Sequence, residues 1–215
     1  MKTVDVRPDL DLFSLDGCPY QCGGIVAASS FQVVDGQLIG AKQIPSPNFN
    51  QRPAEAKIEL VVIHNISLPP SQFGGGYIQQ FFQNQLDATL HPYFETIQEL
   101  KVSAHLLILR TGEVLQFVNL AQRAWHAGRS SYLGQQECND YSIGIELEGS
   151  DDCAFESLQY QVLAQVVVSL QQAYPAIQQH VAGHSDIAPG RKTDPGPYFD
   201  WVKFRSLVHQ IKNAK

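Results

Sequence analysis

The sequence predicts an α/β protein of the α+β kind, built on a single mixed β-sheet covered by helices. Short runs rich in branched residues, such as Ile58 to Ile63, indicate buried strands. Apolar residues at three- and four-residue steps after Phe155 indicate an amphipathic helix. The two patterns follow one another irregularly, which favours one mixed sheet over a strict strand–helix–strand series.

The first regular element expected is a β-hairpin. Phe31, Val33 and Val34 precede Asp35-Gly36, a dipeptide typical of tight hairpin turns, and Leu38 and Ile39 follow it. The preceding residues 1–30 carry mixed charge and show no sustained strand or helix period. We therefore expect an irregular N-terminal extension over residues 1–30 and one folded domain over residues 31–215.

The next element expected is the buried strand from Ile58 to Ile63, which we place as ending at His64. The segment from Ser67 to Gly76 follows it, with two prolines and three consecutive glycines that neither a helix nor a strand accommodates. Long loops beside strand ends often form active-site rims, so we expect such a rim here.

Three more strands and two helices complete the expected domain. Val102 to Leu109 and Glu113 to Val118 are predicted as strands joined by a tight turn, and Ser142 to Leu147 as a further strand. The apolar spacing from Phe155 to Leu170 predicts a helix that ends before Pro175. The segment from Trp201 to Ile211 repeats this spacing more weakly.

Composition excludes several classes of function. A net charge of −6 without any cluster of Lys or Arg offers no surface for nucleic acid. The longest apolar runs are a few residues, far below the roughly 20 of a membrane-spanning helix. Acidic residues interrupt every possible signal-peptide core near the N-terminus, so we expect a cytoplasmic protein with no membrane or nucleic-acid partner.

The four cysteines fit reduced thiols better than a disulfide framework, because they are few and scattered in a chain of 215 residues. Cys18 and Cys22 are four residues apart and resemble half of a metal site. No second pair with matching spacing completes a tetrahedral set, so we interpret these two cysteines as incidental.

Two histidines stand out among the seven in the chain. His64 lies where an apolar strand meets a polar loop, and His184 opens the rigid polar stretch GHSDIAPGRKTDPG. With Asp194 from that stretch they supply two imidazoles and one carboxylate, the donor set of a catalytic zinc site with one position left for water. Spacing alone leaves open that Asp186, His105 or His126 replaces a member. It also leaves open a non-haem iron.

A general base and a cation are also available. Glu146 and Glu148 alternate with apolar residues along one predicted strand, so they share one face, and either could act as the base. Lys192 lies two residues before Asp194. It is interpreted either as a solvated loop cation or as a group that stabilises a developing oxyanion beside the metal.

Five motifs of the sequence closely resemble those of the AmpD-type 1,6-anhydro-N-acetylmuramyl-L-alanine amidases, in the same order. The motifs are VVIHNISLPP (61–70), VSAHLLI (102–108), RAWHAG (123–128), CNDYSIGIELEG (138–149) and GHSDIAPGRKTDPG (183–196). The resemblance extends from about Phe31 to Val208 and leaves out the N-terminal extension. It implies the mixed-sheet fold shared by type 2 amidases and peptidoglycan recognition proteins.

The resemblance also implies roles for individual residues. It places one Zn²⁺ on His64, His184 and Asp194, makes Glu146 the general base and assigns transition-state stabilisation to Lys192. Further residues fall in or beside motifs that contact substrate in related enzymes. These substrate-binding candidates are Asn65, Trp125 and Lys101. His105, His126 and Glu148 are expected to be structural or pocket-lining.

Two positions depart from the family pattern, which commonly has arginines there. Lys101 keeps the positive charge without the bidentate fork of arginine, whereas Glu137 reverses the charge. The departures leave the expected catalytic set intact and put the recognition of the anionic peptide in question.

The function expected from the resemblance is zinc-dependent hydrolysis of the amide between the lactyl group of (anhydro-)N-acetylmuramic acid and L-alanine. The partner is then a small muropeptide released during cell-wall recycling, and we expect the protein to act as a monomer. The family also implies a link to β-lactamase induction. Two alternatives stay open: a module that binds muropeptides without cutting them, and an amidase that acts on intact murein.

Overall fold

The structure is a computed structural model that describes residues 31–214. The predicted N-terminal extension, with Cys18 and Cys22, lies outside these residues. One mixed sheet of six strands forms the centre of the described part. In spatial order its strands are β12 (Val181–Gly183), β5 (Leu60–Ile66), β11 (Ser142–Glu148), β6 (Leu106–Ile108), β7 (Val114–Gln116) and β3 (Lys42–Gln43). Only the β6–β7 pair is antiparallel, so the predicted mixed sheet is confirmed.

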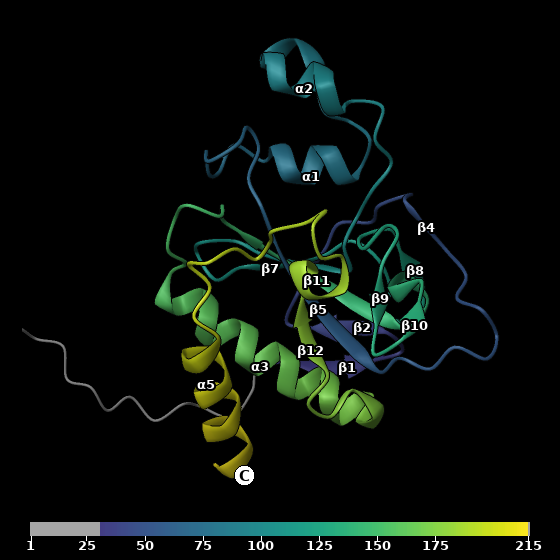
Figure 1. The fold of residues 1–215 in the computed structure, drawn as a ribbon. Coiled ribbons are helices and arrows are strands. Elements are labelled where there is room, and N and C mark those ends of the chain that lie inside the picture. The colour runs from purple at the N-terminus through teal and green to yellow at the C-terminus, as the bar shows by residue number, and fades with distance from the viewer. Residues whose placement is uncertain (1–30, 215) are drawn as a thin grey trace, which may run out of the picture.

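The helices lie on two sides of this sheet (Figure 1). The α-helices are α1 (Tyr77–Phe82), α2 (Pro92–Ile97), α3 (Ser157–Ala173), α4 (His184–Ile187) and α5 (Trp201–Asn213). The short 3₁₀ turns are η1 (Ala88–Leu90), η2 (Cys138–Asp140) and η3 (Pro175–Ile177). Figure 1 shows α3 and α5 together on one side and α1 and α2 projecting at the other. None of the helices within residues 31–214 is long and apolar enough to cross a bilayer.

Three two-stranded ribbons accompany the central sheet. They are β1 (Gln32–Val34) with β2 (Gln37–Ile39), β4 (Phe49–Asn50) with β8 (Arg123–Ala124), and β9 (Ser131–Tyr132) with β10 (Gln135–Gln136). In the first ribbon Val33 lies opposite Leu38, and both Asp35 and Gly36 have positive φ. The hairpin predicted at these residues is therefore confirmed.

The boundaries of several strands differ from the sequence prediction. β5 does not end at His64; it continues to Ile66, because β11 pairs with it over its whole length. In the sequence, the polar His64 follows four apolar residues of β5, so it looks like the first residue of a loop. β6 and β7 are also shorter than predicted: residues 102–105 precede β6 as irregular backbone, with the Ser103 amide donating to the Trp125 carbonyl.

The two central strands present an apolar face to α3 and α5. Val61 and Ile63 of β5 and Ile143, Ile145 and Leu147 of β11 join one large core cluster with buried residues of α3. Side chains alternate between the faces of a strand. The residues between these apolar positions, which include His64 and Glu146, therefore lie on the opposite face of the sheet.

A second core cluster fixes α1 and α2. Phe81 and Phe82 of α1 and Phe94 of α2 pack with Leu107 and Phe117 near the other end of the sheet. The chain enters α1 through Gly74 to Gly76, all three with positive φ, a conformation that glycine adopts without strain. These helices, which the sequence pattern did not predict, place aromatic side chains beside the loop that follows β5.

Candidate metal centre

The candidate site lies at the carboxyl edge of three neighbouring parallel strands. His64 is near the end of β5, Glu146 is near the end of β11, and His184 directly follows β12. Because parallel strands end at the same edge, their last side chains meet there. The loop after α4 brings Asp194 to the same place. There the Ser185 amide donates to the Asp194 carbonyl at 2.9 Å.

His64, His184 and Asp194 form a compact triangle. The Nδ1 atoms of the two histidines are 3.0 Å apart, and each is 3.0 Å from Oδ2 of Asp194. Both imidazoles are almost fully buried, with 1% and 3% of their residue surfaces exposed. This trio is the only group within residues 31–214 in which three such ligand atoms come so close together.

The triangle fits a small divalent cation. Tetrahedral zinc holds nitrogen and oxygen ligands at about 2.0–2.1 Å, which separates the ligand atoms by about 3.3 Å. Nε2 of His184 lies 3.0 Å from the carbonyl oxygen of Ala127, which can only accept a hydrogen bond. The proton of His184 is therefore on Nε2, and its Nδ1 lone pair points at the centre of the triangle, as a metal ligand requires.

The alternative ligands considered from the sequence lie elsewhere. Oδ2 of Asp186 accepts from the Gly183 amide at 2.7 Å, at the start of α4. Nδ1 of His105 accepts from the Gly144 amide at 3.0 Å, and its Nε2 contacts the Gln122 carbonyl. Nδ1 of His126 lies 3.0 Å from Nε2 of His64, the nitrogen of His64 that is not part of the triangle. None of the three therefore belongs to the triangle.

Burial favours the neutral form of the His64 imidazole. It lowers the pKa of His64 to about 4, an effect that Asp194 partly opposes and that the charges of His184 and Lys192 reinforce. A neutral imidazole is the form that binds a metal. His64 is therefore in the form that binds a cation from neutral pH down to mild acid.

Glu146 lies beside the triangle, and its carboxylate is buried with one oxygen unpaired. Only 9% of the residue is exposed, and Oε2 has no hydrogen-bond partner among the described residues. Burial raises the pKa of Glu146 well above its ordinary value; the charge of Asp194 acts in the same direction and that of Lys192 opposes it. A buried carboxyl group with a free oxygen and a raised pKa is suited to take up a proton.

Lys192 faces the same cavity as the triangle and Glu146. Within the part of the chain that the structure describes, its ammonium makes no hydrogen bond or ion pair. Its charge lowers the pKa of both Glu146 and His64, so it lies close enough to act on them electrostatically. Lys192 is nevertheless exposed, so both interpretations, a solvated loop cation and a group that acts in the site, stay open.

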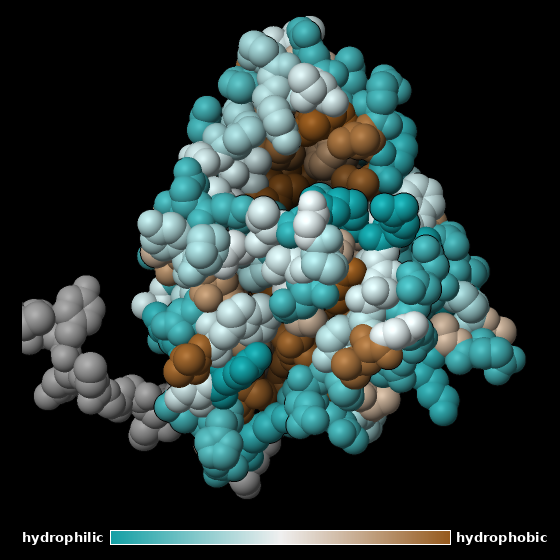
Figure 2. Space-filling view, in the orientation of Figure 1, coloured by the Kyte–Doolittle hydropathy of each residue, from teal (hydrophilic) through white to brown (hydrophobic). Residues whose placement is uncertain are grey.

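These groups line a cavity of about 380 Å³. Its other wall is apolar and comes from the loop after β5 and from α1 and α2. The residues of this wall include Ile66, Leu68, Pro70, Phe81, Phe82, Tyr93, Ile97 and Leu100. Figure 2 shows hydrophobic atoms gathered at the surface beside α1 and α2. Sequence reasoning missed these aromatic residues, for which the clusters YIQQFF and PYF were the available indication.

The three substrate-binding candidates lie in or beside this cavity. Asn65 and Trp125 line it directly; the Asn65 amide donates to Asp151 at 2.7 Å, and Nε1 of Trp125 donates to Asn50 at 2.6 Å. Lys101 lines a smaller neighbouring cavity of about 300 Å³, which shares Trp125 and Lys192 with the first. His184 of the triangle also lines this smaller cavity.

Glu148 and Glu137 are placed differently from Glu146. Glu148 accepts hydrogen bonds from the Gly74 amide at 2.6 Å and the Arg110 amide at 3.1 Å, so it anchors the glycine-rich loop. Glu137 is exposed and lies 3.6 Å from Arg123. Of the three, only Glu146 lines the cavity with the triangle, and it also has an unpaired carboxylate oxygen.

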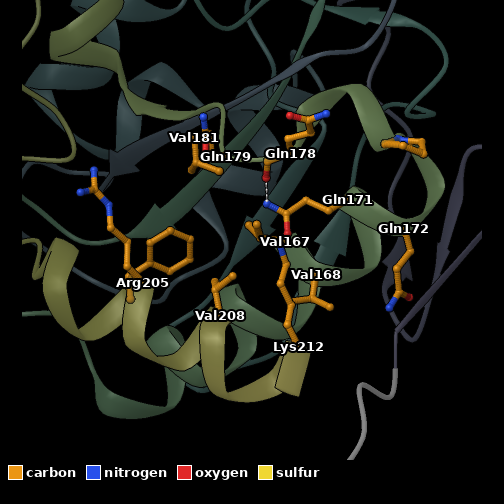
Figure 3. A pocket seen from close by; sticks show the side chains of 12 residues that line it. Val167, Val168, Gln171, Gln172, Gln178, Gln179, Val181, Arg205, Val208 and Lys212 are labelled. Atoms are coloured by element: carbon orange, nitrogen blue, oxygen red, sulfur yellow. Dashed lines mark hydrogen bonds between the residues drawn. The ribbon is translucent and has the colours of Figure 1, made fainter. Parts of the chain in front are cut away.

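A larger cavity of about 800 Å³ lies between α3 and α5 (Figure 3). Its lining consists of valine, glutamine, proline, phenylalanine, arginine and lysine residues, such as Val168, Gln171 and Arg205. It contains no histidine, cysteine or carboxylate. It offers no group for acid–base chemistry or metal binding, so the smaller cavity is the candidate active site.

Comparisons with known proteins agree with this geometry. The 1,6-anhydro-N-acetylmuramyl-L-alanine amidase AmpD of Escherichia coli (strain K12) is 53% identical over 173 residues, which cover 80% of this chain and 94% of the relative. The crystal structure of a selenomethionine derivative of AmpD superposes with a TM-score of 0.80 at 53% identity, covering 82% of this chain and 98% of that one. The complex of E. coli AmiD with anhydro-N-acetylmuramic acid-L-Ala-D-gamma-Glu-L-Lys superposes with a TM-score of 0.53 at 26% identity. The match covers 82% of this chain and 65% of AmiD.

The family profile described as N-acetylmuramoyl-L-alanine amidase matches residues 54–197. This span contains the whole triangle, Glu146 and Lys192, and it excludes the first hairpin and α5. The matched part thus includes the sheet edge that carries the candidate site. The chain belongs to the N-acetylmuramoyl-L-alanine amidase family.

Proposed function

We propose that this protein is a zinc-dependent amidase that cleaves the bond between the lactyl group of N-acetylmuramic acid and L-alanine in muropeptides. One observation carries the proposal: the three residues with converging ligand atoms and Glu146, which has an unpaired carboxylate oxygen, line one cavity. Amide hydrolysis needs these two components, a Lewis acid for the carbonyl and a base for water.

The names of the relatives support the substrate class. AmpD relatives at 53% identity are named for the 1,6-anhydro form of the muramyl group. The AmiD structure contains a substrate with anhydro-N-acetylmuramic acid and a three-residue peptide. We therefore propose a small anhydromuropeptide from cell-wall recycling as the substrate, held between the triangle and the apolar wall of α1 and α2.

In the proposed mechanism, His64, His184 and Asp194 hold one Zn²⁺ per chain. When bound, zinc supplies Lewis acidity that polarises the amide carbonyl and favours deprotonation of water. Glu146 takes the proton from the attacking water and returns it to the amine of the departing L-alanine. Lys192 stabilises the negative charge on the tetrahedral oxyanion.

The remaining cavity residues orient the substrate in this proposal. Trp125 offers an apolar surface with its indole nitrogen held by Asn50. Asn65 and Lys101 supply polar contacts, and the ammonium of Lys101 suits an anionic peptide end. These contacts set affinity rather than the chemistry of bond cleavage.

The proposal includes a monomer acting in the cytoplasm, with no nucleic-acid or membrane partner. The free thiols of Cys138 and Cys153 suit a reducing compartment.

The experiment that tests the function is incubation of the zinc-loaded protein with anhydromuropeptide, followed by mass spectrometry of the products. Release of the free peptide supports the amidase. Binding without release would replace it by the non-cutting recognition module, and equal rates on whole sacculi would replace the fragment specificity. An Asp194→Ala variant serves as the control for contaminating activity.

A further inference from the structure

The hydrogen bonds behind the triangle determine which nitrogen of each ligand histidine carries its proton. For His184 the partner is the Ala127 carbonyl, 3.0 Å from Nε2. A carbonyl oxygen accepts only, so His184 is protonated on Nε2 and its Nδ1 is free.

His64 has a second imidazole as its partner, and this contact alone leaves two choices. Its Nε2 lies 3.0 Å from Nδ1 of His126, and either nitrogen could be the donor. The other nitrogen of His126, Nε2, lies 3.2 Å from Oγ of Ser142. The proton positions in His64 and His126 therefore depend on the direction of the hydrogen bond at Ser142.

Ser142 resolves the choice, because its single hydroxyl proton is already used. Its Oγ donates to the Cys138 carbonyl at 2.5 Å. The hydroxyl oxygen must then accept from Nε2 of His126, and the neutral His126 must accept at Nδ1 from Nε2 of His64. This order leaves Nδ1 of His64 unprotonated, facing His184 and Asp194.

We propose that the two-residue segment His126–Ala127 sets the tautomers of both metal-binding histidines, His64 through the His126 ring and His184 through the Ala127 carbonyl. His126 is then a positioning residue for the metal centre. The inference deepens the zinc site and rests on the proposed function. Partners of this kind typically change metal affinity by about 10–100-fold.

The surrounding structure holds this segment in place. The buried amide of Asn139 accepts from the His126 amide at 3.1 Å and from the Ala127 amide at 2.8 Å. The His126 ring lies against Gly144 of β11, where a Cβ would come within 2.4 Å of Cγ of the ring. Asn139 thus fixes the backbone of the segment, and Gly144 leaves the space that the ring occupies.

The first test reads the tautomers directly. Nitrogen-15 NMR of histidine-labelled, zinc-loaded protein at neutral pH distinguishes protonated, unprotonated and metal-bound ring nitrogens. Both His64 and His184 are expected to carry the proton on Nε2. A proton on Nδ1 of His64 would overturn the proposed order of hydrogen bonds.

The second test measures zinc affinity by competition with a chelator at fixed pH. His126→Ala is expected to lower the affinity by about 10–100-fold. His126→Gln should recover part of it, because the side-chain oxygen of glutamine can accept from Nε2 of His64. His180→Ala, which removes a histidine that contacts Tyr132 away from the triangle, is the matched control and should bind zinc like the wild type.

The outcomes separate this inference from the proposed function. A wild-type protein that binds no zinc overturns the zinc site itself. Equal zinc affinity in the wild type and His126→Ala overturns only the role of His126, and a raised KM with unchanged affinity would make His126 a substrate contact instead. If His126→Ala does not fold, Gly144→Ala displaces the same ring without removing it and is expected to weaken zinc binding.

Discussion

Glu146 and His64 are direct neighbours in the parallel pairing of β11 with β5, so their side chains leave the same face of the sheet side by side. One residue belongs to the metal triangle and the other carries the free carboxylate oxygen. The relative position of proposed base and proposed metal is thus fixed by backbone hydrogen bonds between two buried strands. The His64–Glu146 pair therefore keeps its geometry through the sheet, whereas Asp194 depends on the loop after α4.

Glu146→Gln is expected to retain zinc and lose activity. Loss of a general base typically lowers turnover by about 100- to 10,000-fold. The amide is close in shape to the carboxyl group, so circular dichroism and metal content should match the wild type. Turnover of anhydromuropeptide measures the effect, and full activity in a zinc-loaded Glu146→Gln protein would exclude Glu146 as the base.

The raised pKa of Glu146 also predicts a pH dependence. The base must be deprotonated to act, and burial raises its pKa well above the ordinary value. Activity should therefore fall as pH decreases through that raised pKa, at a higher pH than for an exposed glutamate. The dependence of kcat/KM on pH measures it. An acidic limb at the ordinary pKa of glutamate, about 4.3, would contradict the assignment.

Lys192→Ala is expected to lower turnover by on the order of 100-fold or more, because removal of one oxyanion contact typically has this effect. Zinc content should not change, since Lys192 is outside the triangle. Lys101→Ala is the contrasting variant: it should raise KM more than it lowers kcat, because Lys101 lies in the neighbouring cavity. Steady-state kinetics of both variants separate the two roles.

The zinc-free protein is expected to lose stability in mild acid. Burial lowers the pKa of His64 to about 4, that of His105 to about 3, and that of His126 well below its ordinary value. The unfolded chain takes up these protons from about pH 6.5 downwards while the native state does not, so stability falls with pH. Each of these histidines therefore contributes to the loss of stability as the pH falls below about 6.5.

Glu146 acts in the opposite direction in that range, because its raised pKa makes the native state hold a proton that the unfolded chain releases. Urea unfolding at several pH values measures the net slope. A His64→Asn variant should reduce this slope by about 1.4 kcal/mol per pH unit. A slope that does not change in His64→Asn would mean that His64 is not neutral in the native state.

Metal removal is expected to destabilise the wild type reversibly. A ligand present at about 100 times its Kd stabilises the folded state by about 2.7 kcal/mol. Chelation should therefore lower Tm, and added zinc should restore it. Asp194→Ala has lost one corner of the triangle, so its Tm should respond little to either treatment. Differential scanning calorimetry compares the two proteins.

The resemblance of five motifs to a known family predicted the members of the triangle, whereas residue spacing alone did not. Spacing left Asp186, His105 and His126 as alternatives, since His64 and His184 are 120 residues apart. Which groups meet depends on the strand order β12-β5-β11, which local periodicity does not encode. The motifs in order selected His64, His184 and Asp194, and the structure brings these side chains together; their roles as metal ligands stay predictions.

The misplaced end of β5 and the missed helices have separate physical causes. Neighbouring positions of β5 are buried on both faces, so the alternation that would mark His64 as an internal strand residue is hidden. α1 and α2 have six residues each, too few to show a helical period, and their stability comes from packing of Phe82 and Phe94.

The alternation of side chains along β11 has a consequence for how this protein tolerates insertions and deletions. Ser142, Gly144, Glu146 and Glu148 face the site, whereas the residues between them fill the core beneath α3. A single residue inserted or deleted within the strand would turn Glu146 into the core and an isoleucine or leucine towards the substrate. Folding and catalysis would fail together, so lineages that keep the activity are expected to vary in length only outside this strand.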